Sequence, residues 1–592
     1  MKPHLSSILC VVFLCLPLSL HAEQEADTLT VDTMHVEWYQ SPRRKQAAYY
    51  PTFSEATAHL PIQTDYSDAS AFELDEPRFA YVNILGITRL PLNKSTQQQV
   101  WVEVHDGAGN YFKKRAIIKG QGGYSLKYPK RNFACQFCEA DWSEDTTPDI
   151  RIGRWVKQDA FHFKAFYTDF SRGIGEIAYK LFDHIVSDRA PYWIRGGYYQ
   201  SSKRARCYPD AFPCAVYLSG QLYGIYAWQL KKHRKNMNME KTDENHIHLD
   251  GNLNDANLFR GKVRWTLFEV RNPKQLYTMQ GKDYDGNNPQ ELIDTSSTYY
   301  SADPAQASAM QRSAHVKASV LRLSNIHSQL SALVYQGADT ATLKTAFEQY
   351  FDIESLIDYN VFHDFICNGD GSLKNWQWFT YDGQRWMVTP YDLDQTFGIN
   401  LYGVVRPAAH RHAPLTEGPF YWIDKYYQRQ LRQRYIQLRQ NGTLTAETIL
   451  PIILDWVSRV GETRYSQERQ LWPDSPCYGD PICNEGWEVY PHWEYYDTAP
   501  AYNKAATYHV GDICKLEGRL WQATQTVTRV NPYIRNSQID TLERLEGWVT
   551  ERIAYLDKQY NYTPSSPYDL DGDGILTIAD ITTLIRIYLD EE

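Results

Sequence analysis

The chain contains 592 residues, of which 43% are hydrophobic and 22% are charged, and it carries a formal net charge of -10. This composition is that of a globular protein and excludes a disordered or collagen-like chain, while the mild acidity excludes a general nucleic-acid-binding surface. At about 150 residues per domain, the length predicts several folded units and excludes a single small module.

Residues 1–22 have the composition of a secretory signal peptide. Lys2 precedes an apolar run over Leu5–Leu20, and Ala22 supplies the small residue before the predicted cleavage point. No other stretch approaches about 18 uninterrupted apolar residues, so we expect no membrane span after cleavage. The sequence therefore predicts a secreted, periplasmic or cell-surface protein.

The cysteine spacing fits an oxidising compartment. Ten cysteines occur, and the close pairs Cys207/Cys214 and Cys477/Cys483 predict two local disulfides. The Cys-Gln-Phe-Cys sequence that begins at Cys135 lacks the second pair or the histidines that would complete a zinc site. We interpret it as a structural or free-thiol feature, with a redox or zinc half-site as the alternative.

The sequence predicts mostly β-sheet for the first half of the mature chain. Residues 23–78 form a weakly patterned extension with a strand or two. Beyond them, alternating apolar residues predict strands over Val100–Val104, Arg115–Ile118 and Phe161–Phe166, and a hairpin that pairs Ala215–Leu218 with Gly224–Leu230. Asp169 to Ser171 offer capping side chains for one helix that continues through Phe182.

The second half carries apolar residues at three-and-four spacing, which is typical of helices. The predicted helices cover residues 307–337, 352–367, 426–440, 445–469 and 539–560, and Gly442 stands where the third would end. Residues 471–537 interrupt this pattern with Trp, Tyr, Pro and Cys, which indicates an inserted β-rich module. The predicted fold class is α+β, with a core over 79–470, the insertion 471–537 and a final core helix over 538–560.

The insertion contains Tyr508-His-Val-Gly511-Asp512-Ile-Cys514 and, a few residues later, Gly518-Arg-Leu-Trp521. This segment is faintly similar to small chitin- or cellulose-binding modules, in which exposed aromatic rings stack on sugars. The resemblance implies Trp493 and Trp521 as the platforms. The alternative is a structural β-hairpin module.

The C-terminal segment 564–592 contains a sequence with the spacing of a calcium loop. The predicted Ca²⁺ ligands are Asp569, Asp571, Asp573, Ile575 through its backbone, Thr577 and Asp580. Oxygen donors at these intervals, with Gly574 at the sharp turn, match the coordination of this hard cation. With Asp at the last ligand position, the loop resembles a single EF-hand-like dockerin repeat, which implies a cohesin-type scaffold as partner. A half-dockerin that packs on its own protein is the alternative.

A second acidic motif follows the predicted helix 352–367. Asp370 and Asn375 have the Asp-x4-Asn spacing of a kinase catalytic loop, and Asp392 and Asp394 follow one hairpin later. Phosphoryl transfer needs such a carboxylate, an amide oxygen and a further metal-binding carboxylate. Two carboxylates two residues apart on a strand would point the same way and could face one ion. The alternative is a set of Asp-rich turns.

These residues resemble the signature of the CotH kinase family, which pairs an Asp with Asn-Trp and ends in Pro-Trp-Asp-x-Asp-x-x-Phe-Gly. Further blocks match the family in the same order, over Lys119–Ser125, Pro129–Phe133, Phe163–Arg172 and Leu218–Tyr226. The resemblance implies an atypical, two-lobed protein-kinase-like fold. It also implies transfer of phosphate from ATP, with Mg²⁺ or Mn²⁺, to Ser or Thr of extracellular proteins.

The resemblance also implies individual roles. Asp370 would be the catalytic carboxylate, and Asn375, Asp392 and Asp394 the metal ligands. Nucleotide-binding candidates are Lys130, Ser125, and Lys164 with its helix partner Glu176. Each lysine could instead be a solvated side chain, and the departures at Ser219, Gln229 and Tyr391 leave a degenerate kinase as an alternative.

Two other functions remain open from the sequence. The first is a non-catalytic surface protein of a polysaccharide-degrading complex, which would bind sugar through the insertion and dock through its calcium repeat. The second is a glycoside hydrolase, which needs two carboxylates about 5 to 10 Å apart in a cleft.

Overall fold

The computed structural model describes most of the chain beyond the N-terminal segment. The described ranges are 49–91, 93–143, 146–187, 208–239, 243–251, 314–368, 375–399, 414–473, 481–490, 498–516, 519–535 and 541–563, with a few single or paired positions between them. The predicted signal peptide, Asp370, Cys207, Trp493 and the predicted calcium loop lie outside the described residues.

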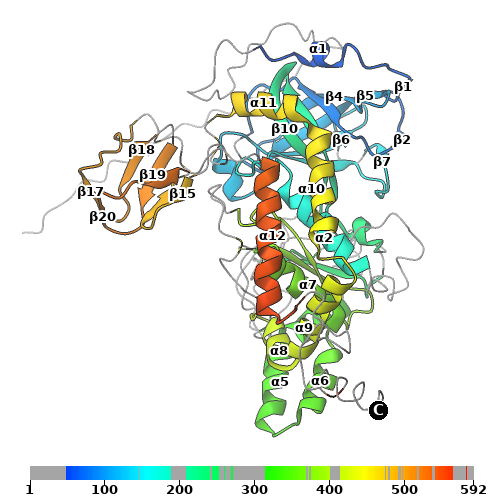
Figure 1. The fold of residues 1–592 in the computed structure, drawn as a ribbon. Coiled ribbons are helices and arrows are strands. Elements are labelled where there is room, and N and C mark those ends of the chain that lie inside the picture. Colours follow the sequence, from blue (N-terminus) through cyan, green and yellow to red (C-terminus); the bar gives the residue numbers. More distant parts are fainter. Residues whose placement is uncertain are drawn as a thin grey trace, which may run out of the picture. The chain divides into compact units, whose positions relative to one another are not determined.

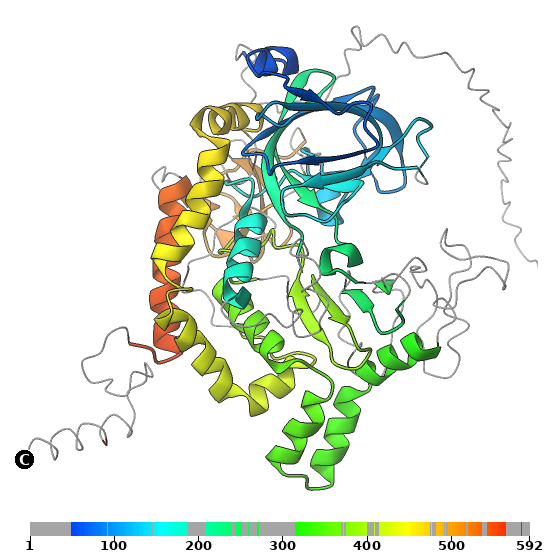
Figure 2. The ribbon, with the colours of Figure 1, turned by 90° about the vertical axis from the view of Figure 1, so that its right-hand side faces the viewer.

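A closed barrel of seven strands forms the first half (Figures 1 and 2). Its strands are β3 (Ala80–Leu85), β4 (Gln98–His105), β5 (Asn110–Gly120), β6 (Phe133–Cys138), β8 (Ala160–Lys164), β9 (Ala211–Leu218) and β10 (Gln221–Leu230). The order is β5-β4-β3-β9-β10-β8-β6, and pairing of β6 with β5 closes the ring. Neighbours are antiparallel except β3 and β9. The strands predicted in this half are confirmed.

The barrel follows the alternation of its sequence. Val82, Ile84, Phe161 and Phe163 belong to one buried cluster that fills the barrel. Because successive side chains of a strand point to opposite faces, Lys164 projects from the outer face of β8, as does His162.

The N-terminal extension packs on this barrel. β1 (Thr64–Asp65) pairs with β5, and β2 (Ala71–Leu74) pairs with β7 (Asp149–Ile152). The short helix α1 (Phe53–Thr57) begins with a capping box of Thr52 and Glu55, and Phe53 is buried.

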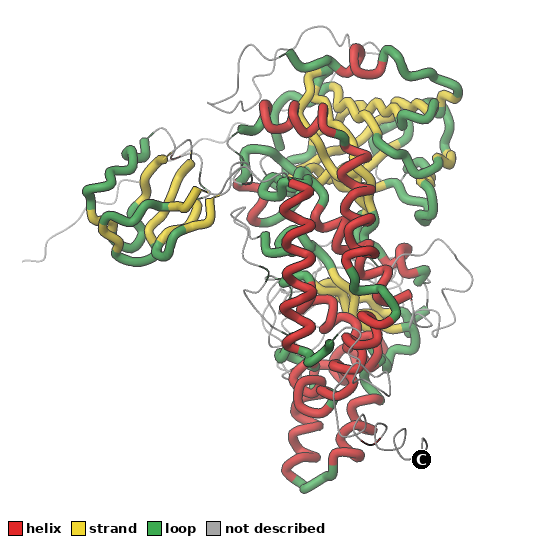
Figure 3. The backbone as a smooth tube through the Cα atoms, viewed as in Figure 1, coloured by secondary structure: helices red, strands yellow, loops and turns green. Residues whose placement is uncertain are grey.

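The second half is mainly helical (Figure 3). Its helices are α4 (Ala314–Ser324), α5 (Ile326–Tyr335), α6 (Thr340–Glu348), α7 (Ile353–Phe365), α8 (Phe420–Tyr426), α9 (Gln428–Gln440), α10 (Ala446–Val460), α11 (Glu462–Leu471) and α12 (Thr541–Gln559), joined by α2 (Ile174–Ser187) from the first half. A sheet of order β12-β11-β13-β14 lies among them, formed by β12 (Glu269–Val270), β11 (Ile247–Gly251), β13 (Trp376–Thr380) and β14 (Met387–Pro390).

The helix predicted over 445–469 is two helices. Gly461 has a φ of +80°, a conformation that a residue with a side chain rarely adopts, and it ends α10 and starts α11. The apolar spacing continues across this break because both helices face the core.

The insertion forms a small β module with a core of its own. Its strands are β15 (Pro481–Cys483), β16 (Trp487–Val489), β17 (Thr507–Tyr508), β18 (Ile513–Leu516), β19 (Arg519–Ala523), β20 (Val527–Thr528) and β21 (Tyr533–Arg535). Trp521 is fully buried in this core with Trp487 and Tyr508. The prediction that Trp521 is an exposed sugar platform is therefore wrong, because its ring fills the module instead.

The two predicted disulfides are not formed in the structure. Cys214 is a free thiol inside the barrel core, and the sulfur of Cys477 is a thiol that lies 2.9 Å from Ser475 Oγ. Sequence spacing alone does not indicate that Cys214 is buried in the barrel core. Separately, none of the described helices is long and apolar enough to cross a membrane.

Candidate active site

A lysine of the barrel meets an aspartate of the helical half. The Nζ atom of Lys164, at the end of β8, lies 3.0 Å from Asp392 Oδ1. The lysine side chain is 6% exposed and the aspartate side chain 33% exposed. Burial favours the neutral amine, but the charge of Asp392, with Tyr391 and Asp394, outweighs it and raises the pKa of Lys164 above its usual range. A charged ammonium and a reachable carboxylate therefore share one site.

Asp392 does not lie on a strand. β14 ends at Pro390, and Asp392 has a φ of +53°, with its N–H donating to the hydroxyl of Tyr179 on α2 at 2.8 Å. The expected common direction of Asp392 and Asp394 on a strand is therefore wrong, because the left-handed residue ends the alternation. Asp394 follows in a bend and is partly buried.

Asn375 lies at the base of the same hairpin. It precedes β13 directly, has a φ of +60°, and its carbonyl accepts a hydrogen bond of 2.9 Å from the N–H of Tyr391. Trp376 pairs with Pro390 in the β13–β14 register. The backbone of Asn375 therefore lies opposite Tyr391, the residue before Asp392.

α7 ends shortly before Asp370 in the sequence. Asp352 caps its N-terminus through the N–H of Ser355, and Cys367, just after its end, has a φ of +51°. The N–H of Phe397 donates to the carbonyl of Ile366 at 2.7 Å. The C-terminal end of α7 is thus tied to the segment that carries Asp392 and Asp394.

Arg552 of α12 holds the end of α7. Its buried guanidinium donates to the carbonyls of Phe365 at 3.1 Å and Ala408 at 2.8 Å, and to both the carbonyl and the carboxylate of Asp364. The hydroxyl of Tyr560 donates to the same carboxylate at 2.9 Å. We did not single out Arg552 from the sequence, since nothing local marks a contact that spans the insertion.

Glu176 has a different partner from the one expected. Its Oε1 accepts a hydrogen bond of 2.5 Å from Gln229 Nε2, while Lys164 pairs with Asp392. Burial, and next the charge of Asp210, raise the pKa of Glu176 to about 8. Glu176 is therefore mostly protonated at neutral pH, and Gln229 donates one hydrogen bond to it.

Ser125 lies in the glycine-rich loop that joins β5 to β6. Its Oγ accepts from Asn132 Nδ2 at 3.1 Å, and Asn132 Oδ1 accepts from the N–H of Ala165 at 2.7 Å. A Cβ at Gly122, whose φ is +110°, would stand 2.0 Å from Ser125 Oγ. The loop is thus fixed at its base to the residue after Lys164.

Lys130, the first candidate for binding phosphates, is placed elsewhere. Its Nζ lies 2.6 Å from both Glu468 Oε1 and the carbonyl of Ile225, and its side chain is 0% exposed. Burial lowers the pKa of Lys130 to about 8. Of the two lysines, the structure brings only Lys164 to the carboxylates, and Lys130 has no ammonium that a nucleotide can reach.

The donor set fits a magnesium ion that is shared with phosphates. Asn375, Asp392 and Asp394 supply hard oxygen donors, and Mg²⁺ typically takes one or two protein carboxylates with phosphate and water oxygens. In the part of the chain that the structure describes, no three His, Cys, Asp or Glu side chains form a ready cage for a metal.

One comparison with known proteins identifies the family of this chain. The family model described as CotH kinase protein matches residues 118–476, more than half of the chain. The match runs from the end of β5 through α11 and contains the barrel lysine and the acidic hairpin. No curated protein matches the chain significantly. The chain belongs to the CotH kinase family.

Proposed function

We propose that the protein is a kinase that transfers the γ-phosphoryl group of ATP, with Mg²⁺ or Mn²⁺, to Ser or Thr hydroxyls of extracellular proteins. The observation that carries this proposal is the 3.0 Å contact between Lys164 and Asp392. A cation for phosphate and a carboxylate for metal, contributed by two halves of the chain, are the parts that phosphoryl transfer requires.

Each half contributes defined groups to this reaction. Lys164 neutralises phosphate charge, and Ser125 in the glycine-rich loop offers a hydroxyl to a phosphate oxygen. Asp370 orients the acceptor hydroxyl and takes its proton, while Asn375, Asp392 and Asp394 would hold the metal. When bound, the metal screens the negative charge that builds up on the transferring group.

The three residues that differ from the family signature, Ser219, Gln229 and Tyr391, are not among the residues proposed to bind phosphate or metal. Gln229 donates to Glu176, and Ser219 occupies the β9–β10 turn with a φ of +49°. Tyr391 is buried, with Lys232 Nζ lying 4.3 Å from its ring centroid. None of the three substitutions removes a proposed metal ligand, which supports an active enzyme over a degenerate one.

Transfer of labelled phosphate from ATP tests the proposal directly. We expect Mg²⁺- or Mn²⁺-dependent autophosphorylation of the wild type, with loss of at least about a hundredfold in Asp370→Ala, Asp392→Asn and Lys164→Met. Lys157→Met is the matched control, because Lys157 is an exposed lysine paired with Asp149 at 3.2 Å. Phosphate transfer that persists in Asp392→Asn, or that is lost equally in Lys157→Met, would contradict the assignment.

We further propose that Asp569, Asp571 and Asp573 bind Ca²⁺ and that this repeat docks the enzyme on a cohesin-type scaffold. The acidic spacing of the sequence supports this, and calorimetric Ca²⁺ titration of the full chain against Asp571→Asn tests it. The non-catalytic sugar-binding alternative has lost Trp521 as a platform. This alternative predicts that the protein is retained on polysaccharide and that Asp392→Asn does not change the retention.

A further inference from the structure

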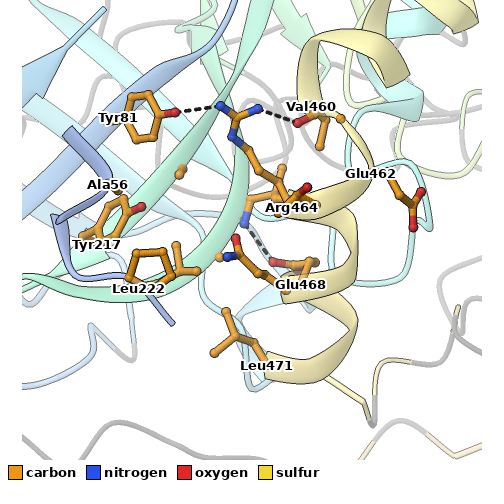
Figure 4. A pocket seen from close by; sticks show the side chains of 16 residues that line it. Ala56, Tyr81, Tyr217, Leu222, Val460, Glu462, Arg464, Glu468 and Leu471 are labelled. Carbon is orange, nitrogen blue, oxygen red and sulfur yellow. Dashed lines mark hydrogen bonds between the residues drawn. The ribbon is translucent and has the colours of Figure 1, made fainter. Parts of the chain in front are cut away.

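Glu468 on α11 is a buried carboxylate that holds two cations. Its Oε1 lies 2.6 Å from Lys130 Nζ and 2.9 Å from Arg172 Nε, and its Oε2 accepts a 2.8 Å hydrogen bond from the N–H of Ile225. The side chains of all three charged residues are 0% exposed. Figure 4 shows Glu468 projecting from α11 toward the barrel, beside a cavity of about 350 Å³.

The first cation anchors the glycine-rich loop. Lys130 lies in the returning limb of this loop, two residues before Asn132, whose side chain binds both Ser125 and the N–H of Ala165. Lys130 Nζ also donates to the carbonyl of Ile225 and lies 4.5 Å from the ring centroid of Tyr226. Glu468 therefore fixes the limb of the loop that contacts the end of β8.

The second cation gathers the turn between Lys164 and α2. Arg172, with a φ of +56°, donates through Nη1 to the carbonyls of Phe166, Tyr167 and Asp169 at 2.8, 2.5 and 2.9 Å. Asp169 in turn caps α2 through the N–H groups of Gly173 and Ile174, both at 2.7 Å. The backbone that follows Lys164 thus depends on the orientation of one guanidinium.

One carboxylate is therefore the common anchor of both segments that flank Lys164. We propose that Glu468 is a positioning residue, which sets the glycine-rich loop and the Lys164 strand end in the geometry that binds ATP phosphates; this inference rests on the proposed kinase function. With Glu468 neutral, Lys130 and Arg172 would both lose the carboxylate that joins them, and the buried guanidinium would be left without its anion, so the loop and the turn would no longer be held together.

Hydrogen exchange of the full chain tests the anchor independently of activity. In Glu468→Gln we expect at least about tenfold faster exchange over residues 121–132 and 165–173, with β3 and β4 unchanged. Asp557→Asn is the matched control, because the Asp557 carboxylate also accepts from three donors, Nε and Nη2 of Arg439 and the hydroxyl of Tyr435. The proposal is overturned if exchange over residues 121–132 and 165–173 is unchanged in Glu468→Gln. It is also overturned if Asp557→Asn accelerates exchange over the same residues equally.

Kinetics separate positioning from mere stabilisation. We expect Glu468→Gln to raise the KM for ATP about tenfold more than it lowers kcat, since loop placement affects phosphate binding first. The double variant Glu468→Gln/Lys130→Met also removes the buried amine that Glu468→Gln leaves without its carboxylate, so its urea midpoint should recover while the raised KM persists. A KM that recovers together with the midpoint overturns the positioning role. If the wild type transfers no phosphate, the kinase proposal fails, whereas the exchange result still decides whether Glu468 anchors both segments.

Discussion

The neutral state of Glu176 leads to a prediction in which removing a carboxylate stabilises the protein. Glu176 is 1% exposed, its pKa is raised to about 8 in the folded state, and the ordinary value is 4.5. Each pKa unit between the folded and unfolded states corresponds to about 1.36 kcal/mol, so ionisation of the folded protein costs about 5 kcal/mol. Glu176→Gln supplies a permanently neutral side chain whose amide oxygen can still accept from Gln229.

The sign of the effect follows from the raised pKa. The folded state retains the proton more strongly than the unfolded state, so this stabilisation is fully present below about pH 4.5 and fully lost above about pH 8. We therefore expect Glu176→Gln to match the wild type at pH 4.5, to exceed it by about 3 kcal/mol at pH 7, and to exceed it by about 5 kcal/mol above pH 8. Urea unfolding at these pH values measures the difference.

The opposite electrostatics would give an opposite result. If Glu176 were ionised and paired with Lys164, Glu176→Gln would lower the free energy of unfolding at neutral pH and the difference would not grow with pH. Asp183→Asn on the same helix, where the side chain is partly exposed, controls for removing a carboxylate from α2. Stability that falls in Glu176→Gln at pH 8 would refute the neutral assignment.

Three further predictions concern other parts of the fold. Arg552→Met should lower the free energy of unfolding, measured in urea, by about 3 to 5 kcal/mol, because the buried carboxylate of Asp364 loses its cation. A loss below about 1 kcal/mol would argue that Arg552 does not hold the end of α7. Trp521→Ala should destabilise the insertion module by about 3 to 5 kcal/mol, because its ring fills the core of the module. Hydrogen exchange over 507–523 should become faster while exchange in the barrel is unchanged. If the module stays intact and loses only polysaccharide binding, the interpretation of Trp521 as a sugar platform would be restored. Cys214 should react with a maleimide only after unfolding, and a non-reduced peptide map that links it to Cys207 would contradict the free thiol.

Local sequence patterns determined the elements of this protein. Alternating apolar residues located the barrel strands, and Asp169 marked the start of α2, which it caps at 2.7 Å through two N–H groups. These features depend on neighbours within a few residues, so the sequence carries them directly. The acidic motif also identified Asn375 and Asp392, which the hairpin register then places close together.

The sequence could not choose between the two lysines. Lys130 and Lys164 both lie in blocks that resemble the family. Closure of the barrel sends Lys164 to Asp392 and buries Lys130 against Glu468, a residue 338 positions away. On α11, Glu468 shares one buried face with Tyr465 and Leu471. An acidic residue on an otherwise apolar helix face is a local sequence signal that could have identified Glu468 as a buried carboxylate.

Backbone conformation and distant partners were the other features that only the tertiary structure decided. The left-handed turn at Asp392 replaces the strand that its spacing suggested, and Arg552 reaches α7 from beyond the insertion. The protonation of Glu176 likewise depends on how deeply α2 is buried against β10. The periodicity of a sequence indicates which face of a helix or strand is apolar. Ion pairs and pKa values depend instead on which faces pack together, and contacts between residues hundreds of positions apart determine that packing.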